Sequence, residues 1–311
     1  MKQFFIVFIA LGLSVGFMGC EEEGIDELID FSEFVPVDDT AYIDLDTLAN
    51  SEPQEKNVYI EDFTGVQCSN CPDAAKRIKS IKEAYPGRVV SMAIHAGADN
   101  FVQPKAGHST YFFVTKEGNN IAGMLGASGS LPEGTVERVK YESEEKIITS
   151  RLTWSGQTDQ RITETTPVNI DFVMEKKEEN SFTFLVRVLY NENVDASDAH
   201  FLAVYLNEND LVDYQYDIIK GDIEDYHHEH VFRKSLTKFD GDSLKVSGES
   251  NPYMAGRVFQ RRFTVTVKED APGETYRTGW NMENLGIVAF VHKKTAEDYE
   301  VLHVKELLVK E

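Results

Sequence analysis

The chain has 311 residues and a formal net charge of −22 at pH 7, with 53 acidic side chains against 31 basic ones. A protein this acidic is a poor candidate for binding nucleic acid or an anionic lipid surface through its overall field. Its length suggests two domains, each large enough to bury a core. Only three cysteines are present, so cysteine chemistry is restricted to few positions.

The N-terminus reads as a secretory signal. Lys2 precedes an apolar run over residues 4–15, and Gly19 precedes Cys20. Because Gly-Cys at the cut resembles a bacterial lipoprotein signal, we expect a signal peptide over residues 1–19 and acylation of Cys20. Cys20 would then attach the protein to the membrane through lipid. The alternative is an ordinary signal peptide with an incidental cysteine.

Residues 20–55 are acidic and lack long periodic patterns, which predicts a tether. The acids directly after Cys20 form either a solvated tether or an export signal, since surface lipoproteins of Bacteroidetes-like bacteria often carry acids there.

Residues 56–160 alternate strand-like and helix-like segments. The apolar run 58–63 predicts a strand, and the spacing of apolar residues over 73–85 predicts a helix that Pro86-Gly87 ends. Residues 88–95 then read as a buried strand. A strand, helix and strand in this order need a crossover and therefore a parallel pair.

The rest of the chain predicts fewer helices. We expect an insertion with one or two short helices over 96–130, a turn into a strand over 131–139 and a closing helix over 144–165. After Pro167, period-two runs separated by polar turns argue for an antiparallel β-sandwich over residues 166–311. These runs are residues 168–172, 182–188, 263–267 and 302–307, and residues 203–205 and 287–291 are further apolar strands.

The most informative motif is Cys68-Ser69-Asn70-Cys71-Pro72, which lies between the first predicted strand and the first predicted helix. The free N–H groups and the dipole of a helix N-terminus stabilise a thiolate. A strand, a CxxC and a helix in this order are typical of a thioredoxin-like site. In an oxidising compartment the pair would be a static disulfide, a redox-active pair or part of a metal site. A four-ligand zinc site would need two further ligands, and no second CxxC supplies them.

Residues 59–72, with Glu61-Asp62-Phe63-Thr64-Gly65 ahead of the cysteines, resemble the Bacteroidetes outer-membrane protein family named after a twenty-eight-kilodalton member. More loosely, the likeness extends to further positions along the chain: His95, Pro132 with Gly134 and Arg138, His230 with Arg233, and the closing strand Ala289-Phe290-Val291-His292. It implies an α/β thioredoxin-like domain followed by an all-β immunoglobulin-like sandwich, together covering residues 56–311. It also implies an outer-membrane lipoprotein that faces either the periplasm or the cell surface.

The thioredoxin likeness assigns roles to four residues. Cys68 would be the attacking thiolate and Cys71 the resolving thiol. Asp62 matches the buried carboxylate that takes a proton from the second cysteine, and burial would raise its pKa. Pro132 matches the cis-proline that faces the disulfide. In the alternative reading, Asp62 is simply paired or partly exposed and Pro132 is an ordinary turn residue. The dipeptide between the cysteines matches neither reductases nor strong oxidants, which leaves the direction of electron transfer open.

A second cluster, Tyr226-His227-His228-Glu229-His230, invites a metal reading. Its spacing does not match a zincin, which needs two histidines four residues apart on a helix. On a strand, His228 and His230 would share one face, which begins a site without completing it. We therefore favour a structural role for this cluster and predict neither a metal nor another cofactor.

These observations predict an envelope-anchored protein that exchanges thiols and disulfides with other envelope proteins through Cys68 and Cys71. The alternative is a non-catalytic surface binding or adhesion lipoprotein in which the same pair forms a structural disulfide. No nucleic-acid partner is expected.

Overall fold

The computed structural model describes residues 52–246 and 248–310. The predicted signal peptide, the lipidation site at Cys20 and nearly all of the predicted tether lie outside the described residues. Among the described residues, no helix is long and apolar enough to cross a membrane.

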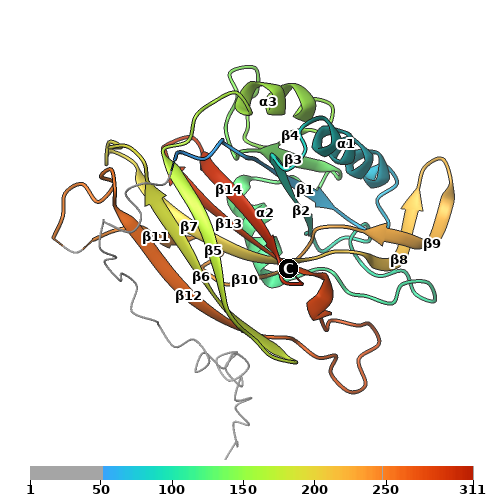
Figure 1. The fold of residues 1–311 in the computed structure, drawn as a ribbon. Helices are drawn as coiled ribbons and strands as arrows, with labels where there is room; N and C mark the ends of the chain where they lie inside the picture. Colours follow the sequence, from blue (N-terminus) through green and yellow to red (C-terminus); the bar gives the residue numbers. More distant parts are fainter. Residues whose placement is uncertain (1–51, 247, 311) are drawn as a thin grey trace, which may run out of the picture. The chain divides into compact units, whose positions relative to one another are not determined.

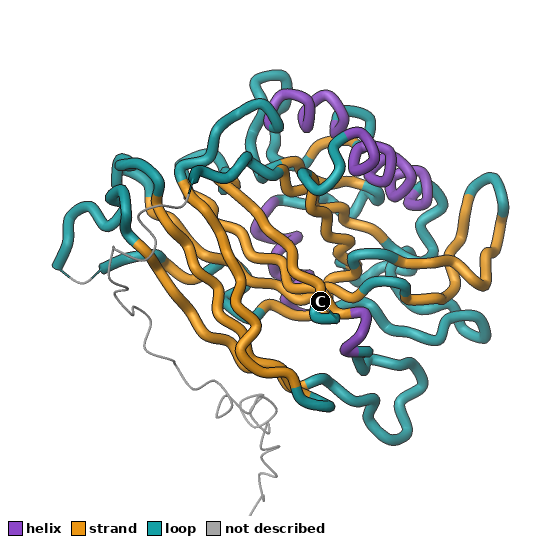
Figure 2. The backbone as a smooth tube through the Cα atoms, viewed as in Figure 1, coloured by secondary structure: helices purple, strands orange, loops and turns teal. Residues whose placement is uncertain are grey.

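Strands predominate over helices in the described part of the chain (Figure 2). Strands make up 39% of the described residues and helices 14%, so this part of the chain is mostly β. The helices are α1 (Cys71–Ala84), α2 (Lys116–Leu125) and α3 (Trp154–Arg161), with a short 3-10 helix η4 (Met282–Asn284). The strands are β1 (Val58–Thr64), β2 (Val89–His95), β3 (Glu133–Val136), β4 (Thr149–Ser150), β5 (Val168–Lys177), β6 (Ser181–Tyr190), β7 (Ala199–Glu208), β8 (Leu211–Asp217), β9 (Gly221–His228), β10 (Val231–Ser235), β11 (Asp242–Ser243), β12 (Val258–Thr266), β13 (Leu285–Lys294) and β14 (Val301–Leu308).

One nine-stranded sheet joins the two halves of the chain. Its order is β14-β13-β7-β10-β2-β1-β3-β4, and β11 pairs with β7 (Figure 1). The predicted parallel pair of β1 and β2 is confirmed. On its other side, β2 pairs with β10, where the Ala93 N–H donates to the oxygen of His230 at 2.9 Å. Strands from the second half therefore continue the sheet of the first half.

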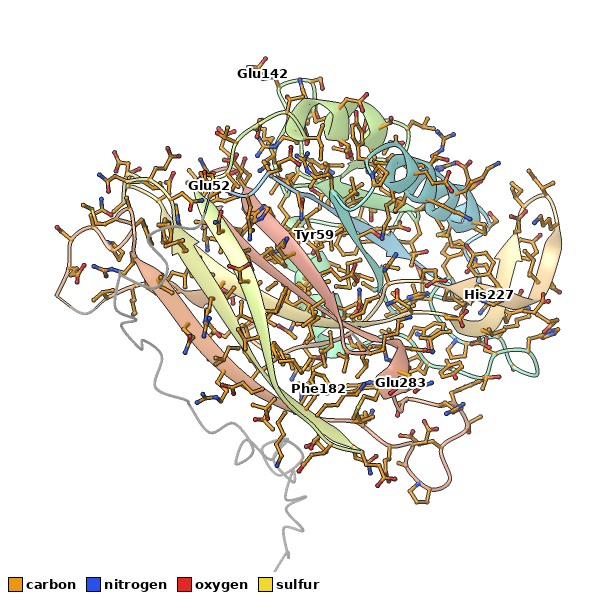
Figure 3. All side chains as sticks on the ribbon, in the orientation of Figure 1. Glu52, Tyr59, Glu142, Phe182, His227 and Glu283 are labelled. Carbon is orange, nitrogen blue, oxygen red and sulfur yellow. A yellow bond between two sulfur atoms is a disulfide. The ribbon has the colours of Figure 1, made fainter. Side chains whose placement is uncertain are left out.

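The strands β13 and β14, at one end of this sheet, lie close to β1. Lys56 Nζ donates to the oxygen of Val301 on β14 at 3.0 Å, close to the start of β1. Tyr59 on β1, labelled in Figure 3, stacks on Phe290 of β13 with ring centroids 4.8 Å apart. The sheet thus curls around a core to which both halves contribute.

Smaller layers cover the sheet. The three-stranded sheet β12-β6-β5 packs against β7 and β13, with Phe184 and Val186 meeting Leu206 and Ile287 in the largest apolar core. The helix α1 packs Ala74, Ile78 and Ile81 against Val58 and Ile60 of β1. The periodicity that predicted α1 is therefore its buried face.

The predicted fold class is wrong. The structure forms no clear α/β thioredoxin-like domain followed by a separate all-β immunoglobulin-like sandwich. The physical reason is the pairing of β10 with β2, which merges the strand–helix–strand unit into a mixed sheet with β7, β13 and β14. The predicted domain boundaries at residues 55, 160 and 166 stay predictions.

The predicted closing helix over 144–165 is also wrong in extent. The strand β4 pairs with β3, and a turn closed by the Thr153 N–H and the oxygen of Ser150 at 2.9 Å precedes the short helix α3. Trp154, at the start of α3, is fully buried and accounts for part of the apolar signal in that segment.

Candidate redox site at the Cys68–Cys71 turn

The two cysteines lie where a central strand passes into a helix. The strand β1 ends at Thr64, and α1 begins at Cys71, with Pro72 in its first turn. Proline suits this position because its missing N–H would have no partner inside the helix. Cys68 and Cys71 form a disulfide with a Cα–Cα distance of 5.4 Å. The pair therefore sits at the positive end of the α1 dipole, which stabilises a thiolate when the bond opens.

Both cysteines are buried, each with 2% of its surface exposed. The cover is the two-stranded sheet of β8 and β9, which we call the β8–β9 hairpin (residues 211–228). The Tyr216 N–H donates to the oxygen of Val66 at 2.8 Å, and the Ile218 N–H donates to the oxygen of Ser69 at 2.9 Å. The hairpin thus binds the backbone of the cysteine turn on both sides of Cys68.

The side chain of Gln215 adds a third link between the hairpin and the turn. Its amide nitrogen lies 3.1 Å from the oxygen of Cys68 and 3.2 Å from the oxygen of Gly65. Gln215 is itself buried, so these bonds form away from bulk water. A buried amide that satisfies two turn carbonyls fixes the conformation of the turn.

The turn is also held by the connection between β2 and α2. The Gln67 N–H donates to the oxygen of Phe101 at 2.9 Å. At Gly65 a Cβ atom would overlap that same Phe101 oxygen, so the close approach requires glycine. Beneath the turn, Val66 packs in a small apolar cluster with Phe113, Leu211, Tyr214 and Val231.

Asp62 lies on the face of β1 that carries α1, because it alternates with Val58 and Ile60, which pack on that helix. It is buried, and within the described residues its Oδ1 atom has no hydrogen-bond partner. Burial raises the pKa of Asp62 from 3.8 to about 7, against a smaller lowering effect of Arg151. A carboxyl group with this pKa can hold or release a proton near neutral pH.

Arg151 connects Asp62 to the helix that bears the cysteines. Its Nε atom lies 2.7 Å from the carboxylate of Asp73, in the first turn of α1. Arg151 also lowers the pKa of Asp62 through space. Asp62 and the first turn of α1 therefore share Arg151 as a charged neighbour.

Pro132 directly precedes β3, and the Leu131-Pro132 peptide bond is cis. The strand β3 pairs antiparallel with β1, with Gly134 opposite Asp62. Pro132 lines a cavity of about 300 Å³ with Ser130, Lys146 and Ile148, and neither cysteine lines it. The structure therefore links Pro132 to Asp62 through β3 and β1.

His95 ends β2 opposite Thr64 and is buried. Its ring lies 4.8 Å from that of Phe113 and 5.9 Å from that of His228. Burial lowers the pKa of His95 well below its ordinary value, so the ring is neutral. His95 therefore contacts Phe113, which belongs to the apolar cluster that packs against Val66 of the cysteine turn.

The histidines of the second cluster are separated. His227 is exposed on the hairpin beside Asp210 (Figure 3). His228 is buried, and its ring contacts the main-chain oxygen of Tyr214. The Nε2 atom of His230 lies 2.7 Å from Nζ of Lys82 on α1. Burial lowers the pKa of His230 to about 3. Across residues 52–246 and 248–310, no group of three or more histidine, cysteine or acidic residues could hold a metal ion.

Sequence reasoning did not find the hairpin or Gln215. The segment Leu211-Val212-Asp213-Tyr214-Gln215-Tyr216 carries a period-two signal, but a register shift between Asp213 and Gln215 disrupts it. The pattern also does not indicate which part of the protein the hairpin packs against. Its contact with a turn almost 150 residues away is a property of the tertiary structure alone.

The family model described as outer membrane protein Omp28 matches residues 122–311, a segment that begins after the two cysteines. HBP35 of Porphyromonas gingivalis aligns over 83% of this chain and 76% of its own, with a TM-score of 0.60 and 19% identity, which shows a shared fold.

A domain of the outer membrane lipoprotein Omp28 from Porphyromonas gingivalis aligns over 46% of this chain and 87% of its own, with a TM-score of 0.30 and 19% identity. No curated protein matches the chain. Because the family model covers more than half of its length, the chain belongs to the Omp28 family of outer membrane proteins.

Proposed function

We propose that this chain is an outer-membrane lipoprotein that exchanges thiols and disulfides with other envelope proteins through Cys68 and Cys71. The observation that carries the proposal is the disulfide at the N-terminus of α1, together with a buried Asp62 on the face of β1 that carries this helix. Family membership supports the outer-membrane location. The lipid on Cys20 would hold the protein at either the periplasmic or the outer face of the membrane.

In the proposed reaction, a client thiolate attacks the Sγ atom of Cys68. The Cys68–Cys71 bond breaks, its electron pair goes to the Cys71 sulfur, and a mixed disulfide joins the client to Cys68. Asp62 supplies a proton to the Cys71 thiolate, which its raised pKa permits near neutral pH.

A second client thiolate then attacks the client sulfur of the mixed disulfide and releases reduced Cys68. The client has lost two electrons and the cysteine pair has gained them. The reverse sequence reduces a client disulfide, and the potential of the pair against its surroundings decides the direction.

Trapping of the mixed disulfide tests the proposal. A Cys71→Ser variant lacks the resolving thiol, so it should accumulate disulfide-linked envelope proteins on Cys68. The Cys68→Ser variant is the matched control and should trap few, because its remaining thiol is not the attacking one. If Cys71→Ser traps no client and its reduced Cys68 resists alkylation, the proposed exchange function is ruled out.

A second function is favoured by the burial of both cysteines, each 2% exposed under the hairpin. In this alternative the disulfide is structural and the protein is a non-catalytic surface binding or adhesion lipoprotein. A Cys68→Ser/Cys71→Ser variant would then bind envelope or host ligands as the wild type does. Loss of all such binding when only the thiols change would remove this alternative.

A further inference from the structure

Exposed apolar side chains gather around the cysteine turn. Among the described residues, seven large apolar side chains are exposed, and five of them lie in the two segments that hold the turn. Val212 lies at the start of β8, and the other four lie at or near the residues that bond to the turn. Ile219 is 90% exposed, Ile218 63% and Phe101 52%, and Tyr216 completes the set. Three of these four residues lie within four positions of each other on the hairpin, and a group of exposed large apolar residues marks an interaction site, whereas single exposed residues do not.

Each segment is fixed to the turn through its backbone. The oxygen of Phe101 accepts from the N–H of Gln67, the neighbour of Cys68. The N–H groups of Tyr216 and Ile218 donate to the oxygens of Val66 and Ser69. Phe101, Tyr216, Ile218 and Ile219, which we call the apolar rim, are thus held next to the reactive pair by three hydrogen bonds.

The charge beside the apolar rim is negative. Asp222, Glu224 and Asp225 on β9 are exposed, and so is Asp99, two residues before Phe101. Lys220 is the basic residue within the turn of the hairpin. A partner that docks here and carries basic residues would gain from this field, and an acidic partner would be repelled.

We infer that the apolar rim is the docking surface for an unfolded polypeptide segment with apolar and basic residues around its cysteine. The inference rests on the proposed exchange function and names its substrate class. A folded protein buries its large apolar side chains, whereas an unfolded chain presents them beside its thiols. The apolar rim therefore selects clients that have not completed folding.

The test compares exchange kinetics of the full-length protein in detergent with two synthetic peptides, each with one cysteine. One peptide flanks the cysteine with leucine and lysine, and the other with serine and glutamate. The wild type should react faster with the first. Ile218→Ser/Ile219→Ser should slow that reaction about tenfold, as expected for the loss of one or two buried apolar contacts.

Two controls separate docking from chemistry. Reaction of the double variant with dithiothreitol should match the wild type, because a small dithiol does not use the apolar rim. Val212→Ser changes an exposed residue at the other end of β8 and should leave both peptide rates unchanged. Equal rates for the two peptides in the wild type, or an unchanged rate in the double variant, would overturn the inference.

Binding without chemistry gives an independent measurement. The leucine-lysine peptide with serine in place of cysteine should bind the wild type more tightly than the double variant by fluorescence anisotropy. Equal binding of both proteins counts against the docking surface. If no peptide and no dithiol reacts with the wild type, the exchange function fails, and the inferred substrate class falls with it.

Discussion

The side chain of Gln215 on β8 donates to the main-chain oxygen of Cys68 at 3.1 Å, so a buried amide from the second half of the chain closes over the disulfide turn of the first half. The same nitrogen lies 3.2 Å from the oxygen of Gly65. The hairpin is therefore tied to the turn by a side chain as well as by two backbone bonds.

Without this amide, the hairpin should open more often and expose the disulfide to solvent. A net hydrogen bond is worth about 1 kcal/mol, so Gln215→Ala should speed reduction of the disulfide by a small dithiol about fivefold. Stopped-flow or quenched-flow alkylation measures the rate. Gln260→Ala makes the same change on β12 and should leave the rate unaltered. Identical rates for Gln215→Ala and wild type would show that the hairpin does not limit access.

The raised pKa of Asp62 makes stability depend on pH. Between 3.8 and about 7 the folded protein holds a proton that the unfolded chain has released, so stability falls as pH rises through this interval. Asp62→Asn removes the cost of ionising a buried carboxyl. The unfolding free energy of Asp62→Asn minus that of the wild type should therefore be larger at pH 8 than at pH 4, by at most about 4 kcal/mol.

Urea unfolding at the two pH values measures this difference. Asp225→Asn, on the exposed face of β9, is the matched substitution and should change the unfolding free energy little at either pH. If the unfolding free energy changes between pH 4 and pH 8 by the same amount in Asp62→Asn and Asp225→Asn, the pKa of Asp62 is not raised.

The buried pair of Glu61 and Arg138 joins β1 to the second residue after β3. Arg138 Nε lies 2.7 Å from the Glu61 carboxylate, and the guanidinium stacks over the ring of Phe290 at 4.7 Å. Arg138→Met leaves the buried Glu61 side chain without its basic partner, which should cost about 3–5 kcal/mol of unfolding free energy. Glu61→Gln/Arg138→Met should recover part of that loss in chemical denaturation. A double variant less stable than Arg138→Met would contradict this account.

Gly134 is required by the close pairing of β3 with β1. A Cβ atom there would overlap the oxygen of Glu61 and the ring of Trp154. Gly134→Ala should therefore lower the unfolding free energy by more than about 2 kcal/mol. Gly123→Ala is the matched change in α2, where a Cβ meets nothing within 4 Å, and should raise stability by roughly 0.5–1 kcal/mol. Thermal unfolding of both variants measures the contrast, and equal effects would contradict it.

Local patterns in the sequence predicted the elements around the cysteines. The apolar run before Cys68, the helical spacing from Ala74 to Ile81 and the buried run to His95 correspond to β1, α1 and β2. Each of these signals arises from residues close together in the chain, where periodicity is direct evidence of the buried face.

The features that no pattern revealed depend on long-range pairing. The sequence predicted two separate domains because nothing in β10 identifies β2 as its partner, although Val231 pairs with Ala93. For the same reason the cover formed by Gln215 and Ile218 was missed. Asp62 is on the α1 side of β1 by simple alternation, but its burial depends on packing that only the tertiary structure supplies.

The reduction potential of the Cys68–Cys71 pair tests the central claim most directly. It is measured by alkylation and mass spectrometry of the protein across a dithiol redox series. We expect a midpoint above about −250 mV, within the range of exchange catalysts. A midpoint below about −300 mV would identify a structural disulfide and contradict the exchange function.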